Sequence, residues 1–364
     1  MKATSLFLTL SALFNVSHSA TTYSSRTIFN PGSGYRTPRT LYARNARLND
    51  GSLLATWENY SPEPPAVYFP IWRSTDDGYS WTPLSNVTDT QNGWGLRYQP
   101  FLYVLPSAIG GYAAGDVLLA GNSIPSDLSK TQLDLYGSRD GGKTWAFISH
   151  IAAGGEAEPT NGLTPVWEPF LLLFNGQLIV YYSDQRDSAH GQKVVHQTTT
   201  DLKTWGSVVN DVAITPYALR PGMPTLASLP NGQWIMTYEE CGDSGGCLVK
   251  YRIASSPLNM ASAAPIQLKA TDGSAPTSSP YVEWTSYGGS SGTIMINANS
   301  DNDIYINKAL GASSSWTRVA TPEPRAYTRM LRSFSSNRLM LMSGGTLGGS
   351  NHVSNSMMDL TTVF

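Results

Sequence analysis

The chain contains the eight-residue turn Ser74-Thr75-Asp76-Asp77-Gly78-Tyr79-Ser80-Trp81 and repeats it as Ser138-Arg139-Asp140-Gly141-Gly142-Lys143-Thr144-Trp145. A weaker copy runs from Thr198 to Trp205, and the faintest copy ends at Trp316. The copies recur at intervals of about 60 residues or twice that, which marks them as parts of a repeated supersecondary unit. Such a unit buries its apolar face only against its neighbours, so the turn predicts an array of similar units.

A second pattern alternates with this turn and consists of an apolar strand, a tight turn and a more apolar strand. Its six copies are 39–58, 98–122, 167–183, 223–239, 279–297 and 327–343. Turns such as Asn175-Gly176 and Asn231-Gly232 are strong hairpin signals. Six units of four antiparallel strands predict an all-β, six-bladed β-propeller. The sixth unit ends after its third strand, so we expect segment 25–30 to supply the outer strand and close the ring.

The first 20 residues have the pattern of a secretory signal peptide, with Lys2, an apolar run over 6–14 and small residues up to Ala20. We therefore expect residues 21–364 to form one secreted domain. No later segment offers the ~20 consecutive apolar residues that span a membrane. A formal net charge of -2 without a basic cluster argues against nucleic acid or an anionic membrane as a partner.

The expected secretion affects how the cysteines and the N-glycosylation sequons are interpreted. Cys241 and Cys247 are the two cysteines of the chain, and in an oxidising compartment we expect them to form a local disulfide. Asn59 and Asn86 begin N-glycosylation sequons, which predicts surface loops. The residue spacing predicts no metal site and no cofactor.

Strand direction separates two groups of acidic residues. The repeated turns join the third and fourth strands of a unit, and there Asp76 and Asp140 are predicted to be structural, since the turn aspartate accepts backbone N–H groups. The first strands start, and the second strands end, on the opposite face near the axis. The acidic residues at that face are Glu58, Glu168, Asp184, Glu239 and Glu240.

Glu168 and the pair Glu239–Glu240 belong to neighbouring units, so they can face each other at the axis. The apolar neighbours of Glu168, Trp167 and Pro169, should desolvate its carboxyl group and raise its pKa, which suits a general acid. We interpret Glu58 as a surface charge or a member of an ion pair. Most glycoside hydrolases use two carboxyl groups that face each other across a cleft.

Several sequence runs resemble known families. The repeated turns resemble the Asp boxes of the sialidase superfamily. A closer resemblance, to the fungal exo-arabinanases of glycoside hydrolase family 93, rests on the runs Trp167-Glu168-Pro169, Tyr182-Ser183-Asp184-Gln185-Arg186 and Tyr238-Glu239-Glu240-Cys241. This resemblance implies a six-bladed, sialidase-like fold. It also implies cleavage of linear α-1,5-linked L-arabinan from the non-reducing end, with release of arabinobiose and retention of configuration.

The resemblance also implies roles for individual residues. Glu168 matches the general acid/base, and the nucleophile falls within Glu239–Glu240. Glu240 is preferred because its separation from Glu168 fits the family's pair. Glu239 stays open, because adjacent strand residues point to opposite sides and only one can face the axis. The residues expected to bind the sugar are Arg36, Trp94, Tyr98, Trp167, Asp184, Arg186, Glu239 and Tyr327.

The expected partner is thus linear arabinan or its oligosaccharides. Arabinofuranose is neutral, so binding should rest on stacking and on hydrogen bonds to hydroxyl groups. A closed ring leaves no strand edge to pair with another chain, and we expect a monomer.

Two alternatives stay open. A sialidase would use Tyr327 as the nucleophile, with an arginine clamp drawn from Arg36, Arg220, Arg325, Arg329 and Arg332. An arginine cluster at the axis, with Glu168 turned away, would favour that enzyme, whereas an outward Arg36 would favour an arabinanase. A non-catalytic carbohydrate-binding propeller would repeat similar sites between blades. The concentration of acidic residues in two neighbouring units favours one central site instead.

Overall fold

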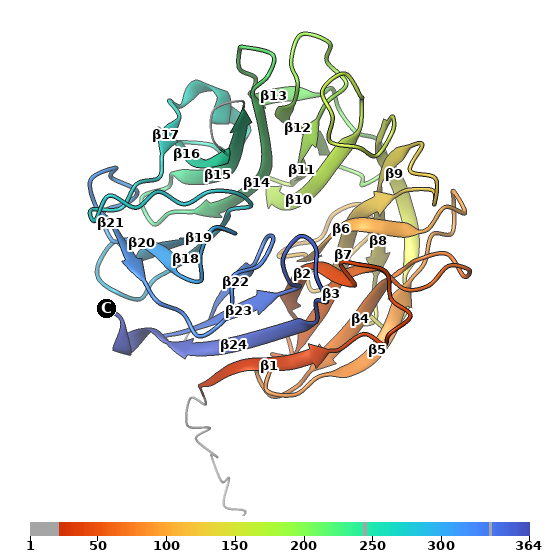
Figure 1. Ribbon diagram of the computed structural model, residues 1–364, viewed down its shortest axis with the longest axis horizontal. Coiled ribbons are helices and arrows are strands. Elements are labelled where there is room, and N and C mark those ends of the chain that lie inside the picture. The colour runs from red at the N-terminus through yellow and green to blue at the C-terminus, as the bar shows by residue number, and fades with distance from the viewer. Residues whose placement is uncertain (1–21, 243–245, 335–336) are drawn as a thin grey trace, which may run out of the picture.

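The computed structural model describes residues 22–242, 246–334 and 337–364. Within these residues the chain forms six four-stranded antiparallel sheets and two short 3-10 helices. Figure 1 shows the sheets arranged radially around a central axis, with the first strand of each sheet innermost. The predicted six-bladed propeller is confirmed. The predicted signal peptide, residues 1–20, lies outside the described residues. No helix in the described part of the chain is long and apolar enough to cross a membrane.

The blades follow the chain in order. Blade one comprises β2 (Thr40–Arg47), β3 (Leu53–Asn59), β4 (Phe69–Ser74) and β5 (Thr82–Val87). Blade two comprises β6 (Leu96–Val104), β7 (Val117–Ser123), β8 (Thr131–Ser138) and β9 (Ala146–Gly154). Blade three comprises β10 (Val166–Phe174), β11 (Gln177–Asp184), β12 (Lys193–Thr199) and β13 (Val209–Val212). Blade four comprises β14 (Arg220–Ser228), β15 (Trp234–Gly242), β16 (Gly246–Ala254) and β17 (Ile266–Gln267), with helix η1 (Pro257–Ser262) between the last two strands.

The last two blades complete the ring. Blade five comprises β18 (Tyr281–Thr285), β19 (Thr293–Asn297), β20 (Ile304–Asn307) and β21 (Trp316–Val319). Blade six comprises β22 (Met330–Phe334), β23 (Arg338–Ser343), β24 (Val353–Asp359) and β1 (Tyr23–Phe29), and helix η2 (Leu360–Thr362) follows β24.

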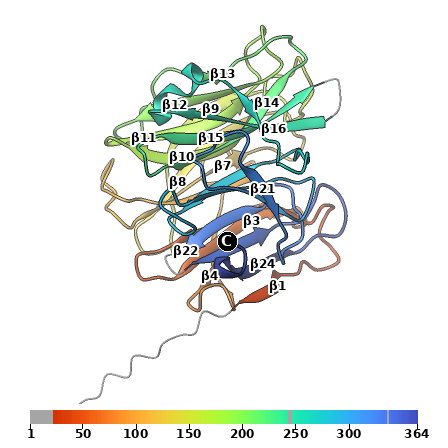
Figure 2. The same cartoon turned by 90° about the vertical axis from the view of Figure 1, so that its left-hand side faces the viewer.

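The ring closes where strand β1 pairs with β24, as the sequence predicted. The two strands run antiparallel, with Arg26 opposite Asn355, and Figures 1 and 2 show them side by side at one edge of the disc. A buried carboxylate supports this seam: Glu323 accepts hydrogen bonds from the hydroxyl groups of Ser354 and Ser356, each at 2.5 Å. Closure through a strand from the other end of the chain covers the outer edge of β24 and gives blade six its fourth strand.

The repeated turns connect the third and fourth strands of blades one to three, and their aspartates are structural, as predicted. The Oδ1 atom of Asp76 accepts the backbone N–H of Ser80 at 2.9 Å, and Oδ1 of Asp140 accepts that of Thr144 at 3.0 Å. Gly78 has φ 82°, a left-handed conformation that glycine adopts without steric cost. These side chains are committed to the turns and do not take part in the axial site.

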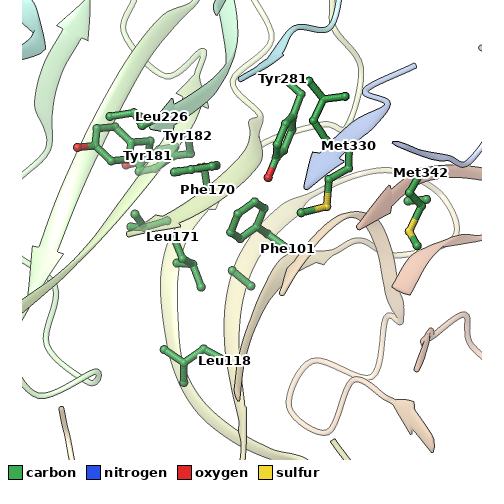
Figure 3. Packing of buried hydrophobic residues seen from close by; sticks show 14 of the residues in the cluster. Phe101, Leu118, Phe170, Leu171, Tyr181, Tyr182, Leu226, Tyr281, Met330 and Met342 are labelled. Carbon is green, nitrogen blue, oxygen red and sulfur yellow. The ribbon is translucent and has the colours of Figure 1, made fainter. Parts of the chain in front are cut away.

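The inner strands pack against one another through a buried apolar cluster at the axis. Figure 3 shows Phe101, Phe170, Tyr281 and Met330 converging from four different blades. The rings of Phe101 and Phe170 lie 4.7 Å apart between centroids, and all four residues are buried. This cluster fixes the inner strands in position beneath the face where they start.

The inner strands share an irregularity that the sequence did not predict. In blades one to four, two residues of the inner strand oppose one residue of the second strand, which defines a β-bulge. The first bulged residue has a left-handed backbone in each case: φ is 53° at Tyr42, 61° at Gln99, 63° at Glu168 and 58° at Met223. Left-handed conformations are uncommon for residues other than glycine. The bulge re-aims this side chain, and in blade three that side chain is Glu168.

Candidate active site

A cavity of about 370 Å³ lies on the face where the inner strands start. Residues from blades one to four and from the loops beside blade six line it. Three lining carboxylates come from strands of the blades, namely Glu58 from β3, Glu168 from β10 and Glu239 from β15. A second cavity, of about 530 Å³, is lined by residues towards the other end of the inner strands and has Glu283 as its one carboxylate. Of these two cavities, the first is the one that brings several acids together.

Glu168 occupies the bulge of β10 and is 8% exposed. Its Oε2 atom accepts the hydroxyl of Ser183 at 2.5 Å and the backbone N–H of Met223 at 2.9 Å. Its Oε1 atom makes no hydrogen bond within the described part of the chain. Burial raises the pKa of Glu168 above its usual value, although the two hydrogen bonds oppose the shift. The carboxyl group is therefore held by one oxygen, with the other free to exchange a proton.

The structure brings Glu239, rather than the preferred Glu240, into the cavity with Glu168. The Oε2 atom of Glu239 accepts the backbone N–H of Ser279 at 2.8 Å. Burial and the charge of Glu168 raise the pKa of Glu239 to about 7. Glu240 is not among the lining residues, and its Oε1 atom pairs with Lys250 Nζ at 2.5 Å. The cause is the alternation of side chains along β15, which places neighbouring residues on opposite sides.

Gly222 shows how close the two acids lie. It is the residue directly opposite Glu239 in the β14–β15 pair. A Cβ atom at Gly222 would lie 3.4 Å from Glu168 Oε2 and 2.4 Å from the Nε2 atom of Gln192. Glu168 thus reaches the strand pair that carries Glu239, and the charge of Glu168 raises the pKa of Glu239. Glycine at this position leaves room for Gln192 Nε2 and for Ser183 Oγ, the hydroxyl that holds Glu168, since a Cβ atom would lie 3.1 Å from that hydroxyl.

Glu58 is the third carboxylate of the cavity, and the interpretation of it as a surface charge or ion-pair member was wrong. It is 3% exposed and belongs to no ion pair among the described residues. It accepts the hydroxyl of Tyr60 at 2.8 Å and the backbone N–H of Gln99 at 3.0 Å. Burial raises the pKa of Glu58 to about 7. The sequence placed Glu58 on the correct face but gave no sign that it was enclosed.

Arg220 is the cation of the cavity. Its guanidinium group donates to Asn161 Oδ1 at 2.7 Å, to Gln185 Oε1 at 3.0 Å and to Gln192 Oε1 at 2.9 Å. These neutral partners leave the positive charge uncompensated by a direct ion pair, and it lowers the pKa values of both Glu168 and Glu239. Sequence analysis considered Arg220 only as part of a sialidase clamp.

The predicted sugar-binding residues divide into two groups. Tyr98, Trp167, Glu239 and Tyr327 line the cavity. Trp167 donates its Nε1–H to Gln185 Oε1 at 2.9 Å, which fixes the indole, and the ring of Tyr98 lies 6.0 Å from that of Tyr60. Burial and the charges of Glu168 and Glu239 raise the pKa of Tyr327 well above its usual value, so its hydroxyl stays protonated.

The other four predicted residues do not line the cavity, and their contact with the sugar stays a prediction. Arg186 donates three hydrogen bonds to the Asp184 carboxylate, one from its backbone N–H at 2.9 Å and two from its guanidinium group at 2.9 and 2.8 Å. Arg36 has a side chain that is 59% exposed and lies 3.7 Å from a carboxylate oxygen of Glu63. Trp94 lies outside the cavity and has Lys130 Nζ 5.7 Å from its ring. These contacts stabilise loops around the site.

The arginines that a sialidase clamp would require do not converge. Of Arg36, Arg220, Arg325, Arg329 and Arg332, only Arg220 lines the cavity. Arg329 is fully buried and donates to the backbone carbonyls of Glu323 and Asp303. Arg332 donates to Asn45 and lines the other cavity. Glu168 faces the cavity and Arg36 points outward, which is the arrangement expected for an arabinanase.

The predicted disulfide is present and borders the site. Cys241 and Cys247 are bonded across the β15–β16 hairpin, where they are direct partners. Cys241 lines the cavity, with its Sγ atom 3.4 Å from Glu239 Oε1. Both sulfurs are committed to the disulfide, so this cluster of Glu239 and two cysteines lacks the thiolates that a soft metal prefers.

The two predicted glycosylation sites differ in accessibility. Asn59 is the last residue of β3 and is 3% exposed, so the expectation of a surface loop there was wrong. A glycan on its amide nitrogen would not fit the folded blade. Asn86 is exposed on the outer strand β5, and its modification stays a prediction.

Comparisons with known proteins give close structural matches. The chain is similar to an α-L-arabinanase of Penicillium chrysogenum solved with arabinobiose, with 54% identity, coverage of 94% of this chain and 100% of that chain, and a TM-score of 0.93. It is also similar to the GH93 α-L-arabinofuranosidase of Fusarium graminearum solved with arabinobiose, at 51% identity, with 94% and 99% coverage and a TM-score of 0.92.

More distant matches inform on the fold alone. A sialidase of Streptococcus pneumoniae shares 8% identity over 94% of this chain and 71% of that chain, with a TM-score of 0.61. No family model and no curated protein sequence matches the chain.

Proposed function

Because the chain belongs to glycoside hydrolase family 93, we propose that it is an exo-acting enzyme that cleaves linear α-1,5-linked L-arabinan from the non-reducing end and releases arabinobiose. The observation that carries this proposal is the meeting of Glu168 and Glu239 in one cavity across Gly222. Both similar fungal enzymes were solved with arabinobiose, the product that the proposal names.

The reaction proceeds with retention in two steps. In the first, the Glu239 carboxylate attacks the anomeric carbon while Glu168 donates its proton to the glycosidic oxygen, which leaves as an alcohol. In the second, Glu168 takes a proton from water, and the water oxygen displaces Glu239 from the sugar. Glu239 replaces Glu240 as the proposed nucleophile because Glu240 lies outside the cavity and pairs with Lys250.

The environment of the two acids supports these roles. Burial favours the protonated form of Glu168, as a general acid requires. When Glu168 holds a proton its charge no longer opposes ionisation of Glu239, so a single proton on the pair suits the first step. Arg220, which interacts favourably with both carboxylates, helps to keep Glu239 ionised.

The rest of the cavity suits a neutral sugar. Trp167, Tyr98 and Tyr60 offer aromatic surface, and Gln192 and Arg220 offer polar groups that can orient hydroxyls. Tyr327 acts here as a hydrogen-bonding residue rather than a nucleophile, since its raised pKa keeps the phenol protonated.

Secretion and a monomeric state are further parts of the proposal. The sequence pattern of residues 1–20 supports export, and the disulfide between Cys241 and Cys247 suits an oxidising compartment. The ring sealed by β1 supports a monomer, which a light-scattering mass would test.

The experiment that tests the function compares three substrates side by side: linear arabinan, arabinotriose and a sialoside. Arabinobiose as the sole early product from arabinan, without hydrolysis of the sialoside, is the expected result. Release of arabinose alone, or of a ladder of longer oligosaccharides, would contradict the proposed product or the exo mode. Hydrolysis of the sialoside would contradict the substrate class.

A further inference from the structure

Glu58 is the structural counterpart of Glu239 in another blade. In blade one Glu58 pairs with Leu41, the residue before left-handed Tyr42. In blade four Glu239 pairs with Gly222, the residue before left-handed Met223. Both acids thus occupy the same position relative to the bulge, near the end of the second strand, and both line the same cavity.

Both carboxylates also bind the next blade in the same way. Glu58 Oε1 accepts the N–H of Gln99, and Glu239 Oε2 accepts the N–H of Ser279, at 3.0 and 2.8 Å. Gln99 and Ser279 are themselves left-handed residues at the start of their blades. One oxygen of each acid therefore holds a neighbouring blade, and this contact fixes the direction of the carboxylate.

A purely structural role does not account for the charge of Glu58. Its partners, the hydroxyl of Tyr60 and the amide of Gln99, are neutral donors. No lysine or arginine of the described residues lies within 4 Å of its carboxylate oxygens. The charge of Arg44 lowers the pKa of Glu58 from a greater distance, but the Arg44 guanidinium donates to the backbone carbonyl of Thr328 at 2.8 Å. A buried carboxylate without an ion pair is costly, and glutamine would serve both observed contacts.

Glu58 lines the cavity, and its carboxylate oxygens can accept more hydrogen bonds than the fold provides. An ionised carboxylate accepts about four hydrogen bonds, of which the fold uses two. Resting on the proposed function, we propose that Glu58 is a substrate-binding residue that accepts hydrogen bonds from hydroxyl groups of an arabinofuranose unit. The cavity then requires free hydroxyls on that unit, which selects linear arabinan over arabinan carrying a substituent there.

The test measures binding of arabinobiose to the Glu58→Gln variant by titration calorimetry. Glutamine keeps an acceptor for Gln99 but loses the charge, and hydrogen bonds to charged groups contribute about 1.5–3 kcal/mol. The expected result is a Kd raised roughly 10- to 100-fold, with a smaller ratio of activity on linear over branched arabinan. The matched control is Glu283→Gln, which changes a half-buried carboxylate of the other cavity and should leave the Kd unchanged.

The outcomes separate this inference from the proposed function. If the wild-type protein fails to bind arabinobiose, the proposed function fails. If wild type binds but Glu58→Gln binds within twofold of wild type, only the role of Glu58 is overturned. Should Glu58→Gln not fold, Glu58→Asp keeps the charge and withdraws it by one methylene. Weaker binding with an unchanged melting temperature supports the proposal, and unchanged binding refutes it.

Discussion

The substitution Glu168→Gln tests the role of Glu168 as the general acid/base of the cavity. The amide oxygen of glutamine can take the place of Oε2, where it accepts from Ser183 and from the backbone of Met223. The side chain therefore keeps its anchor and its volume, and the change removes mainly the transferable proton. General acid–base catalysis contributes about 10²- to 10⁴-fold, or about 3–5 kcal/mol of the barrier.

The size of the loss should depend on the leaving group. An alcohol leaves arabinotriose only if it is protonated, so kcat/KM should fall by about 10²- to 10⁴-fold. A nitrophenolate leaves without a proton, so cleavage of a 4-nitrophenyl arabinobioside should fall far less in its first step. Added azide should accelerate turnover of the variant, because azide attacks the covalent intermediate without needing Glu168 as a base.

Two controls make the result decisive. Glu283→Gln changes a half-buried carboxylate in the other cavity and should retain wild-type rates on both substrates. An equal loss of Glu168→Gln activity on arabinotriose and on the nitrophenyl substrate would refute the acid role and indicate a role in binding or folding. An unchanged rate on arabinotriose would remove Glu168 from the mechanism altogether.

Three further predictions concern other acids. Glu239→Gln should lower kcat by several orders of magnitude. Glu240→Gln should keep kcat. It breaks the partly exposed 2.5 Å ion pair with Lys250, so denaturant titrations should show a free energy of unfolding lower by about 1 kcal/mol or less. The pH profile of kcat/KM on arabinan should fall on the alkaline side as Glu168 loses its proton and on the acid side as Glu239 gains one. The acid limb should lie below the pKa of about 7 that Glu239 has beside an ionised Glu168, because a protonated Glu168 no longer raises that pKa. In Glu168→Gln with the nitrophenyl substrate the alkaline fall should vanish. Burial raises the pKa of Glu323 at the ring seam from 4.5 to about 7, so its contribution to stability is complete below pH 4.5 and is lost as the pH rises through 7. The melting temperature should fall less steeply over this window in Glu323→Gln than in wild type, and an equal slope would contradict the assignment.

The fold could be predicted because its signals are local and repeated. Both full copies of the eight-residue turn carry their own aspartate, glycine and tryptophan, and these contacts form within the turn wherever the rest of the chain lies. The count of strands after the last turn showed that blade six was one strand short, which identified β1 as the closing strand. These inferences required no knowledge of side-chain direction.

The choice between Glu239 and Glu240 did require such knowledge. Residues 235–238 of β15 are all buried, because a blade of the ring is covered on both faces. The alternation of polar and apolar residues that would reveal the inward side is therefore missing. The bulges add one residue to the inner strands of blades one to four. Counting along β10 therefore does not predict which side of the strand Glu168 faces.

A sequence motif does not show which of its residues reach the cavity. Asp184 and Arg186 belong to the same run as Ser183, yet only Ser183 contacts a cavity acid, while the other two bind each other. The sequence run identifies the segment that borders the site. Which of its side chains point into the cavity depends on where β11 ends. Glu58 and Arg220 were undervalued because their enclosure depends on loops from other blades.

The most direct test of the central claim is to trap the covalent intermediate and to locate it by peptide mass mapping. An arabinofuranoside with an activated leaving group and a fluorine beside the anomeric carbon should form the intermediate and hydrolyse slowly. The account predicts one adduct, on Glu239, and no adduct in the Glu239→Gln variant. An adduct on Glu240 or Tyr327, or a first-formed product of inverted configuration, would contradict it.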